Sequence, residues 1–206
     1  MDSLQSELAA GIQALGLTLE PEAQQRLLEF LHLLQKWNRA YNLTAIDTLP
    51  EMITHHVLDS LAIAPYVKGA RILDAGTGAG FPGIPLALYY PNQQFVLLDS
   101  VGKKIRFLQQ AITQFKFDNV TAVQERMEKF VLLPGFDVII CRALGKIQEV
   151  MSQTEHLLNA NGQWLFMKGV YPATELEQVS QAYVVHKINI PNIAAERHII
   201  VVDKKE

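Results

Sequence analysis

Two acidic residues and a glycine-rich turn form the part of the sequence whose residue types and spacing are best suited to chemistry. Asp74 and Asp99 each end a short apolar run, and the apolar segment Ile84–Tyr90 lies between them. The glycines that follow Asp74 are Gly76, Gly78 and Gly80. This order predicts a strand, a glycine turn, a helix and a second strand. Ligands of open α/β sheets bind at the carboxyl ends of strands, so these residues predict a ligand site at that edge.

The charge of Asp74 distinguishes between two ligand classes. Gly78, Gly80 and Gly83 also fit the dinucleotide pattern G-x-G-x-x-G. A pyrophosphate beside Asp74 would be repelled by about 4 kcal/mol per charge pair at 4 Å and an effective dielectric of 20. S-adenosylmethionine carries sulfonium and ammonium cations, so the same carboxylate would attract it, while Asp99 could accept hydrogen bonds from its ribose hydroxyls. The pattern therefore favours S-adenosylmethionine, with a purely structural glycine turn as the alternative.

The composition narrows the class of protein and of partner. A chain of 206 residues can form one domain, or one domain with an appendage, and it has no apolar run long enough for a membrane span. We expect a cytoplasmic monomer with no membrane contact and no signal peptide. The single cysteine, Cys141, argues against a disulfide or a zinc site, and no metal is expected. With a net charge of −3, contact with RNA would require a local basic patch.

The first third of the chain has a helical pattern, and we expect residues 1–65 to form a helical cap on a cofactor-binding domain of residues 66–206. Apolar residues spaced by three and four run from Leu27 to Tyr41 and predict an amphipathic helix. Its other flank carries Lys36 and Arg39, whose spacing alone favours a solvated face.

A second helix is expected over residues 50–64, and it carries two adjacent histidines. His55 and His56 would point about 100° apart, which makes them poor joint ligands for a metal. A hydrogen-bonded His56 beside Asp59 is the expected arrangement.

Cations follow Asp99 in the first turn of the next expected helix. Lys103, Lys104 and Arg106 lie where the helix dipole disfavours positive charge. They predict either a patch for an anionic partner or a merely solvated surface, and the sequence alone leaves both open.

A short expected strand, Val120–Gln124, leads to Met127 and Glu128. In this class of sheet the third strand ends beside the adenine. We therefore expect Met127 to pack on the ring, and Glu128 or a backbone amide to contact its edge.

The fourth and fifth expected strands bring two more cations to the same edge. Phe136–Ile140 leads to Cys141 and Arg142, and Gln163–Met167 leads to Lys168. The fourth strand lacks the Asn/Asp-Pro-Pro-aromatic run of enzymes that methylate exocyclic amines, and Cys141 is interpreted as buried. Two cations at one rim favour an anionic substrate, with structural salt bridges as the alternative.

The remaining segments complete the predicted α/β pattern. Helices are expected at Lys146–Ala160 and near Thr174–Ala182. The strands near Tyr183–Ile190 and Glu196–Val202 are expected to close the sheet as an antiparallel hairpin.

Several motifs together resemble one known family over nearly the whole chain. They are Trp37-Asn38-Arg39, Tyr41-Asn42-Leu43-Thr44, His56-Val-Leu-Asp59-Ser60, Asp74-Ala-Gly-Thr-Gly-Ala-Gly-Phe-Pro-Gly83, Leu98-Asp99-Ser100, Lys103-Lys104, Cys141-Arg142-Ala143, Lys168-Gly169 and Glu196-Arg197-His198. The family is the bacterial small-subunit ribosomal RNA guanine-N7 methyltransferase, also called glucose-inhibited division protein B. Ala79 stands where members often have proline.

The resemblance implies a Rossmann-like, seven-stranded, mostly parallel sheet with helices on both faces and an N-terminal helical extension. It also implies a cytoplasmic enzyme that uses S-adenosylmethionine to methylate N7 of one guanine in a 16S rRNA hairpin loop, either in free RNA or in an assembling small subunit. Cofactor contacts carried over are Gly76, Phe81, Met127, Glu128 and Arg142, beside Asp74, Gly78, Gly80 and Asp99. Candidate RNA contacts are Arg39, Lys103, Lys104, Arg142, Lys168 and Arg197.

The implied chemistry requires little of the side chains. Guanine N7 has a free lone pair, so methyl transfer needs no general base, and Arg142 is predicted to position cofactor or substrate. A methyltransferase acting on another RNA, a protein or a small molecule, and a non-enzymatic RNA- or nucleotide-binding protein, remain the alternatives.

Overall fold

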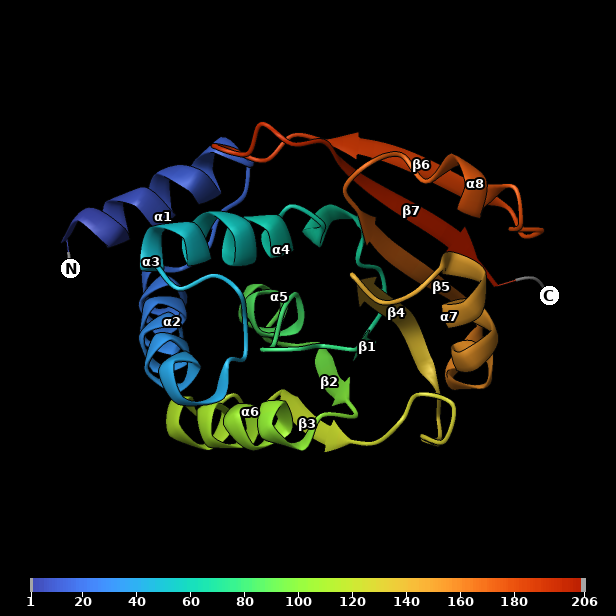
Figure 1. Ribbon diagram of the computed structural model, residues 1–206, viewed down its shortest axis with the longest axis horizontal. Helices are drawn as coiled ribbons and strands as arrows, with labels where there is room; N and C mark the ends of the chain where they lie inside the picture. Colours follow the sequence, from blue (N-terminus) through green and yellow to red (C-terminus); the bar gives the residue numbers. More distant parts are fainter. Residues whose placement is uncertain (1, 205–206) are drawn as a thin grey trace.

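One seven-stranded sheet organises the molecule (Figure 1). The computed structural model describes residues 2–204, and its strand order is β3-β2-β1-β4-β5-β7-β6. The strands are β1 (Arg71–Ala75), β2 (Gln94–Asp99), β3 (Val120–Gln124), β4 (Phe136–Arg142), β5 (Leu158–Lys168), β6 (Tyr183–Ile188) and β7 (Arg197–Asp203). Strands β1 to β5 pair in parallel, whereas β7 runs antiparallel to both β5 and β6. The mostly parallel sheet and its closing antiparallel hairpin are confirmed.

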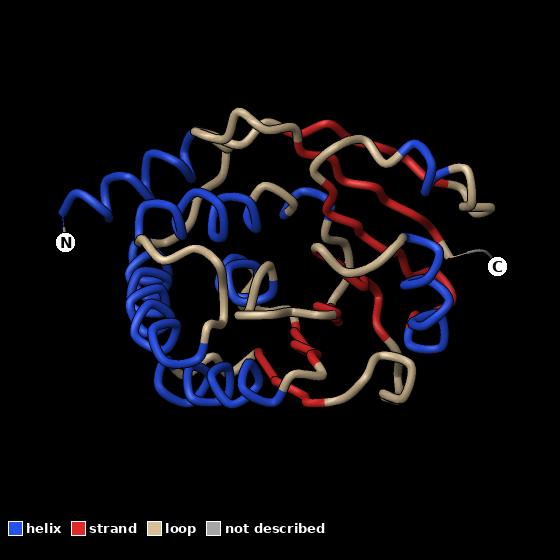
Figure 2. Tube along the Cα trace, viewed as in Figure 1, coloured by secondary structure: helices blue, strands red, loops and turns tan. Residues whose placement is uncertain are grey.

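Helices cover both faces of this sheet unequally (Figure 2). The helical segments are α1 (Asp2–Ala14), α2 (Pro21–Tyr41), α3 (Leu49–Met52), a π-helix η1 (Ile53–Leu58), α4 (Asp59–Leu61), a 3₁₀ turn η2 (Ala64–Tyr66), α5 (Gly83–Tyr89), α6 (Gly102–Phe115), α7 (Ile147–Thr154), a 3₁₀ turn η3 (Glu155–Leu157) and α8 (Ala173–Leu176). Because side chains alternate along a strand, Ile72 packs into the core with α1 to α6, and Leu73 into the core with α7 and α8.

The N-terminal helices share a hydrophobic core with the sheet. Phe30 of α2 is fully buried, and its ring centroid lies 5.7 Å from that of Phe81 and 5.6 Å from that of Phe107. The chain leaves α2 through Asn42, whose φ of 47° is left-handed. The buried Asn38 side-chain oxygen accepts hydrogen bonds from the backbone N–H groups that follow this turn. This turn directs the segment after α2 toward the edge where β1, β4 and β5 end.

Two predicted helices in the second half are shorter than expected. The helix expected at Lys146–Ala160 ends at Thr154, and β5 already begins at Leu158, which pairs with Phe136 of β4. The apolar residues near this junction suit a helix or a strand, and pairing with β4 decides the outcome. The helix expected near Thr174–Ala182 is only α8, because few residues of that segment are buried.

Within residues 2–204, no helix has the length and apolar character needed to cross a bilayer.

Candidate functional site

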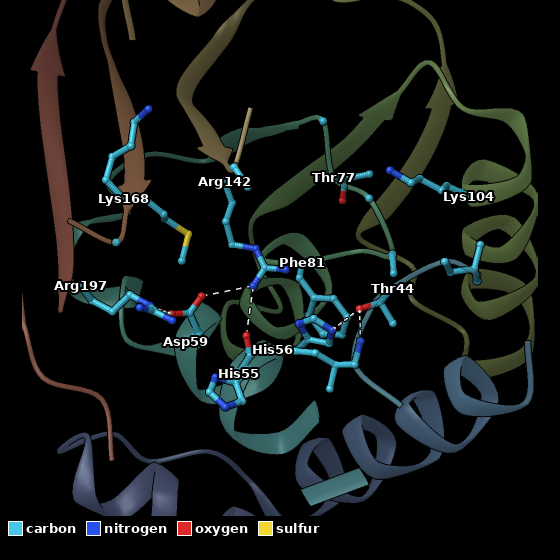
Figure 3. Close-up of a pocket in the computed structure, with 18 residues that line it drawn as sticks. Thr44, His55, His56, Asp59, Thr77, Phe81, Lys104, Arg142, Lys168 and Arg197 are labelled. Atoms are coloured by element: carbon cyan, nitrogen blue, oxygen red, sulfur yellow. Dashed lines mark hydrogen bonds and ion pairs between the residues drawn. The ribbon is translucent and has the colours of Figure 1, made fainter. Parts of the chain in front are cut away.

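Two adjoining cavities lie at the carboxyl ends of the parallel strands. The larger, about 640 Å³, lies between the N-terminal segment and the ends of β1, β4 and β5 (Figure 3). The smaller, about 410 Å³, lies at the ends of β2 and β3. Both are lined by Gly76, Lys104 and Ala143, so they meet at the glycine turn. The sequence placed the ligand site at this edge, and the structure forms a two-part cleft there.

Asp74 holds the glycine turn from below. Its carboxylate is fully buried, and Oδ2 accepts hydrogen bonds from Thr77 Oγ1 at 2.7 Å and from the Gly83 N–H at 2.8 Å. Burial raises the pKa of Asp74 to about 6, although both hydrogen bonds oppose that shift. Asp74 lines neither cavity. The sequence placed the Asp74 charge beside a cationic ligand; in the structure the carboxylate lies beneath the turn rather than in the wall of either cavity, where it holds the Thr77 and Gly83 groups of the turn.

The glycine turn needs its glycines for backbone conformation and for space. Gly76, Gly78 and Gly80 have φ values of 68°, 62° and 97°. A Cβ on Gly80 would lie 2.8 Å from Leu108 Cδ2 and 2.9 Å from Ile84 Cγ1. A larger residue there would meet both strain and a clash, so the close packing of the turn on α5 and α6 depends on this glycine.

Asp99 joins the glycine turn to the smaller cavity. Its Oδ2 accepts a hydrogen bond from the Gly78 N–H at 3.0 Å, and its Oδ1 accepts one from the Val101 N–H at 2.9 Å. Lys104 Nζ lies 3.4 Å from Oδ2. Met127 and Glu128 line the same cavity. The residues predicted to contact ribose and adenine thus occupy one cavity, with Lys104 at the junction between the two.

Arg142 and Arg197 meet at one carboxylate in the larger cavity (Figure 3). Arg142 Nη1 donates to Asp59 Oδ2 at 3.2 Å and to the His55 carbonyl at 3.3 Å. Arg197 Nε donates to Asp59 Oδ1 at 2.9 Å. The Arg142 guanidinium carbon also lies 5.7 Å from the centre of the Phe81 ring. The end of β4 and the beginning of β7 therefore bring two guanidinium groups to the same point.

Lys168 lies at the next strand end. In the β4–β5 register, Arg142 pairs with Met167, so the two cations reach the same rim, as expected. Lys168 Nζ donates to Glu175 Oε2 at 2.9 Å and to the Gly145 carbonyl at 3.2 Å. The salt bridges considered as the alternative are also present, so each cation has both a protein partner and a position on the cavity.

His56 is a neutral part of the cavity wall. Its Nε2 lies 2.9 Å from Thr44 Oγ1, and its ring stacks on Phe81 with a centroid separation of 4.5 Å. Burial, followed by the Arg142 charge, lowers the pKa of His56 to about 3. The predicted pairing of His56 with Asp59 is wrong, because Asp59 binds the two arginines instead.

The other candidate RNA contacts lie outside both cavities. Lys103 Nζ donates to the Tyr41 carbonyl at 2.6 Å, and so binds the end of α2. Arg39 is exposed in the last turn of α2.

Cys141 is buried, as expected, and burial raises the pKa of its thiol. Across residues 2–204, no group of three His, Cys, Asp or Glu side chains could hold a metal ion.

The family is decided by comparison with known proteins. The family model for rRNA small subunit methyltransferase G (GidB) matches residues 23–200. The chain belongs to this family. A relative from Coxiella burnetii (strain RSA 331 / Henzerling II), called Ribosomal RNA small subunit methyltransferase G, is 54% identical over 196 residues, which cover 94% of this chain and 95% of the relative. A relative of the same name from Klebsiella pneumoniae (strain 342) is 40% identical over 203 residues, which cover 97% and 98%.

Solved structures support the fold. A SAM dependent methyltransferase from Aquifex aeolicus superposes with a TM-score of 0.59 at 13% identity, covering 75% of this chain and 93% of the other. M. jannaschii TYW2, solved in complex with AdoMet, superposes with a TM-score of 0.56 at 17% identity, covering 72% and 74%. The Rossmann-like methyltransferase fold expected from the sequence is confirmed.

Some cavity residues of this rRNA small subunit methyltransferase G family member were not predicted as site residues. Thr44, His55, Asp59, Ala143 and Met167 all line the larger cavity. The sequence carried a signal for three of these, because Thr44, Asp59 and Ala143 lie inside the motifs on which the resemblance rests. Their contacts join segments far apart in the chain, which spacing alone does not reveal.

Proposed function

We propose that the protein transfers the methyl group of S-adenosylmethionine to N7 of one guanine in a hairpin loop of 16S rRNA. The observation that carries this proposal is the two-part cleft, in which a cavity with three carboxylates in its wall adjoins, at the glycine turn, a cavity lined by four lysine and arginine side chains. We propose that the smaller cavity binds the nucleoside half of the cofactor, with Asp99 accepting from the ribose and Met127 and Glu128 beside the adenine.

The residues present fit this cofactor. Asp99 offers a carboxylate with little exposure at the end of β2, where adjacent ribose hydroxyls can donate to it. Gly76 lines both cavities and Gly78 lines the larger one, and without side chains both let a ligand approach the backbone closely. Phe81 and Arg142, in the larger cavity, are proposed to position the end that carries the reactive methyl group.

The proposed mechanism relies on orientation. S-adenosylmethionine supplies an electrophilic methyl group, and guanine N7 supplies a lone pair with no proton to remove. The cavity matches this requirement, because His56 is neutral and already hydrogen-bonded to Thr44. Holding two reactants in attack geometry is worth up to about 7–11 kcal/mol, so positioning groups such as Arg142 can supply most of the catalysis.

Substrate binding is proposed to use the cations at the rim. Lys104, Lys168 and Arg197 line the larger cavity and can approach phosphate oxygens of an RNA loop. Because the whole chain is acidic, this local cluster would carry most of the electrostatic attraction. Arg39 and Lys103 are proposed as outer contacts for the flanking RNA.

We propose that residues 1–65 act as a cap on the cofactor-binding domain of residues 66–206. Thr44, His55, His56 and Asp59 come from this cap and form one wall of the larger cavity. We propose that the protein acts as a monomer in the cytoplasm, on either free 16S rRNA or an assembling small subunit.

Mass-spectrometric mapping of 16S rRNA tests this function. RNA from cells that lack the protein should be missing one 7-methylguanosine, and the parent gene should restore it. An Asp99→Asn gene expressed at the same level should restore it poorly. Identical modification maps with and without the protein would refute the proposal and favour another RNA or a small molecule as substrate.

A further inference from the structure

Asp59 occupies a central position in the larger cavity. Its side chain is 7% exposed, and its two oxygens accept from different arginines. These arginines belong to β4 and β7, whereas Asp59 belongs to the N-terminal helical segment. One carboxylate thus connects the cap with two strand ends (Figure 3).

The bridge leaves donors of both arginines available to a ligand. Arg142 uses Nη1 for its two contacts, and Arg197 uses Nε for Asp59 and Nη1 for the Glu196 carbonyl. Within residues 2–204, the Nη2 groups of both arginines have no hydrogen-bond partner. Both side chains are partly exposed, at 22% and 25%, and both line the cavity. The pair keeps a net positive charge after Asp59 is counted, so it can bind an oxyanion.

The local backbone explains how Asp59 reaches this position. It follows directly on the π-helix η1, and such wider turns within helices often occur at functional sites. The same turn supplies the His55 carbonyl that binds Arg142 and the His56 ring that stacks on Phe81. This short segment therefore contacts Arg142 directly through His55 and Asp59, and it also packs on Phe81, whose ring lies beside the Arg142 guanidinium group.

We propose that Asp59 is a positioning residue for methyl transfer, which holds Arg142 and Arg197 as a fixed pair for an oxyanion. The oxyanion is the carboxylate of the cofactor or a phosphate of the RNA. Without a shared carboxylate, two neighbouring guanidinium groups would repel each other and lose their common orientation. Asp59 does not act on a proton, because guanine N7 carries none. This inference rests on the proposed function.

The test is a double-mutant cycle on single-turnover methyl transfer to 16S rRNA. Asp59→Asn should slow transfer by about tenfold or more in the parent protein, because positioning is lost. In the Arg142→Ala/Arg197→Ala background the same change should cost less than about twofold, because its partners are already absent. If Asp59 were purely structural, Asp59→Asn would slow transfer by the same factor in both backgrounds, and that result would overturn the proposal. A parental rate for Asp59→Asn would overturn it too.

Two further arms make the result decisive. If Asp59→Asn binds S-adenosylmethionine more weakly in calorimetry, the oxyanion held by the two arginines is the cofactor carboxylate. If its KM for RNA is higher instead, the oxyanion is an RNA phosphate. If both were unchanged, the proposal would be refuted. Glu196→Gln, which removes the exposed Lys187–Glu196 pair beside Arg197, is the matched control and should transfer at the parental rate.

Asp59→Glu keeps the charge but moves the carboxylate by one methylene, and it replaces Asp59→Asn if that variant does not fold. It should also be slow, and a parental rate would contradict the proposal. A parent protein that binds S-adenosylmethionine but transfers no methyl group to rRNA would instead refute the proposed function.

Discussion

Replacing Asp99 with asparagine should weaken the binding of S-adenosylmethionine by about 10- to 100-fold. Asp99 Oδ1 can be replaced by the amide oxygen, which would still accept from the Val101 N–H. The amide NH₂ would then replace Oδ2 and face the Gly78 N–H and the Lys104 ammonium, which are also donors. The mutant therefore loses its charge, its contact with the glycine turn and an acceptor for the ribose.

The magnitude follows from the charge-assisted hydrogen bonds. Such bonds contribute about 1.5–3 kcal/mol when one partner is ionised, and tenfold in affinity corresponds to about 1.4 kcal/mol. With 7% of the residue exposed, little solvent is available to replace the lost acceptor. Titration calorimetry with S-adenosylmethionine measures the effect directly.

Two controls separate the ribose contact from a general effect of charge or loop shape. Glu125→Gln removes another carboxylate from the smaller cavity, and should change affinity by less than about threefold because this side chain is exposed. A cofactor analogue that lacks the ribose hydroxyls should bind parent and Asp99→Asn with more similar affinities. If Asp99→Asn is folded and binds S-adenosylmethionine as tightly as the parent, the assignment of the ribose site is wrong.

Three further predictions concern catalysis, stability and RNA binding. Arg142→Ala should slow single-turnover methyl transfer by about 100-fold. Arg142→Lys should restore little of the rate, because an ammonium group lacks the planar, two-pronged geometry of a guanidinium group. Full activity of Arg142→Ala would show that Arg142 does not position cofactor or substrate. Burial raises the pKa of Asp74 from 3.8 to about 6, so the folded state binds the carboxyl proton more tightly than the unfolded state does. The free energy of unfolding should therefore fall by about 3 kcal/mol as pH rises from about 4 to above 6. Denaturation at several pH values should show this fall in the parent but not in Asp74→Asn. If the free energy of unfolding depends on pH equally in both proteins, the raised pKa of Asp74 is wrong. Lys104→Glu should weaken the binding of both cofactor and RNA. Lys103→Glu should weaken RNA binding and flatten its salt dependence without changing cofactor affinity. If the RNA affinity of Lys103→Glu and of the parent depends equally on salt, Lys103 does not contact the RNA.

Local patterns were enough to predict the framework of the site. Apolar runs that end in Asp74 and Asp99 predicted two strand ends, and the structure places both acids there. The alternation of strands and helices predicted that Arg142 and Lys168 would reach one rim, and the β4–β5 register confirms it. Parallel sheets bring consecutive strand ends together, so this information is carried by short segments of sequence.

Contacts between distant segments were beyond such reasoning. Asp59 lies 83 residues from Arg142 and 138 from Arg197 in the chain, and nothing in their spacing predicts a shared carboxylate. The short spacing between His56 and Asp59 predicts a pair, although the partner of His56 is Thr44, across the exit from α2. Asp74 was expected to face the ligand because its charge was considered without the Thr77 and Gly83 donors that bury it.

The same limit explains the helix ends. The residues after Thr154 could continue a helix, but Glu155–Leu157 form only the 3₁₀ turn η3, and pairing of Leu158 with Phe136 begins β5. Tertiary pairing of this kind overrides local preference.

Methyl transfer to guanine N7 is tested most directly with purified protein and S-adenosylmethionine that carries an isotopically labelled methyl group. The 16S rRNA is supplied either free or in small-subunit particles. Nuclease digestion and mass spectrometry then locate the label. We expect one labelled guanine, methylated at N7 and located in a hairpin loop, and much less label with Arg142→Ala. Label on an exocyclic amine or on another base, or no label in RNA when calorimetry shows bound cofactor, would contradict the account.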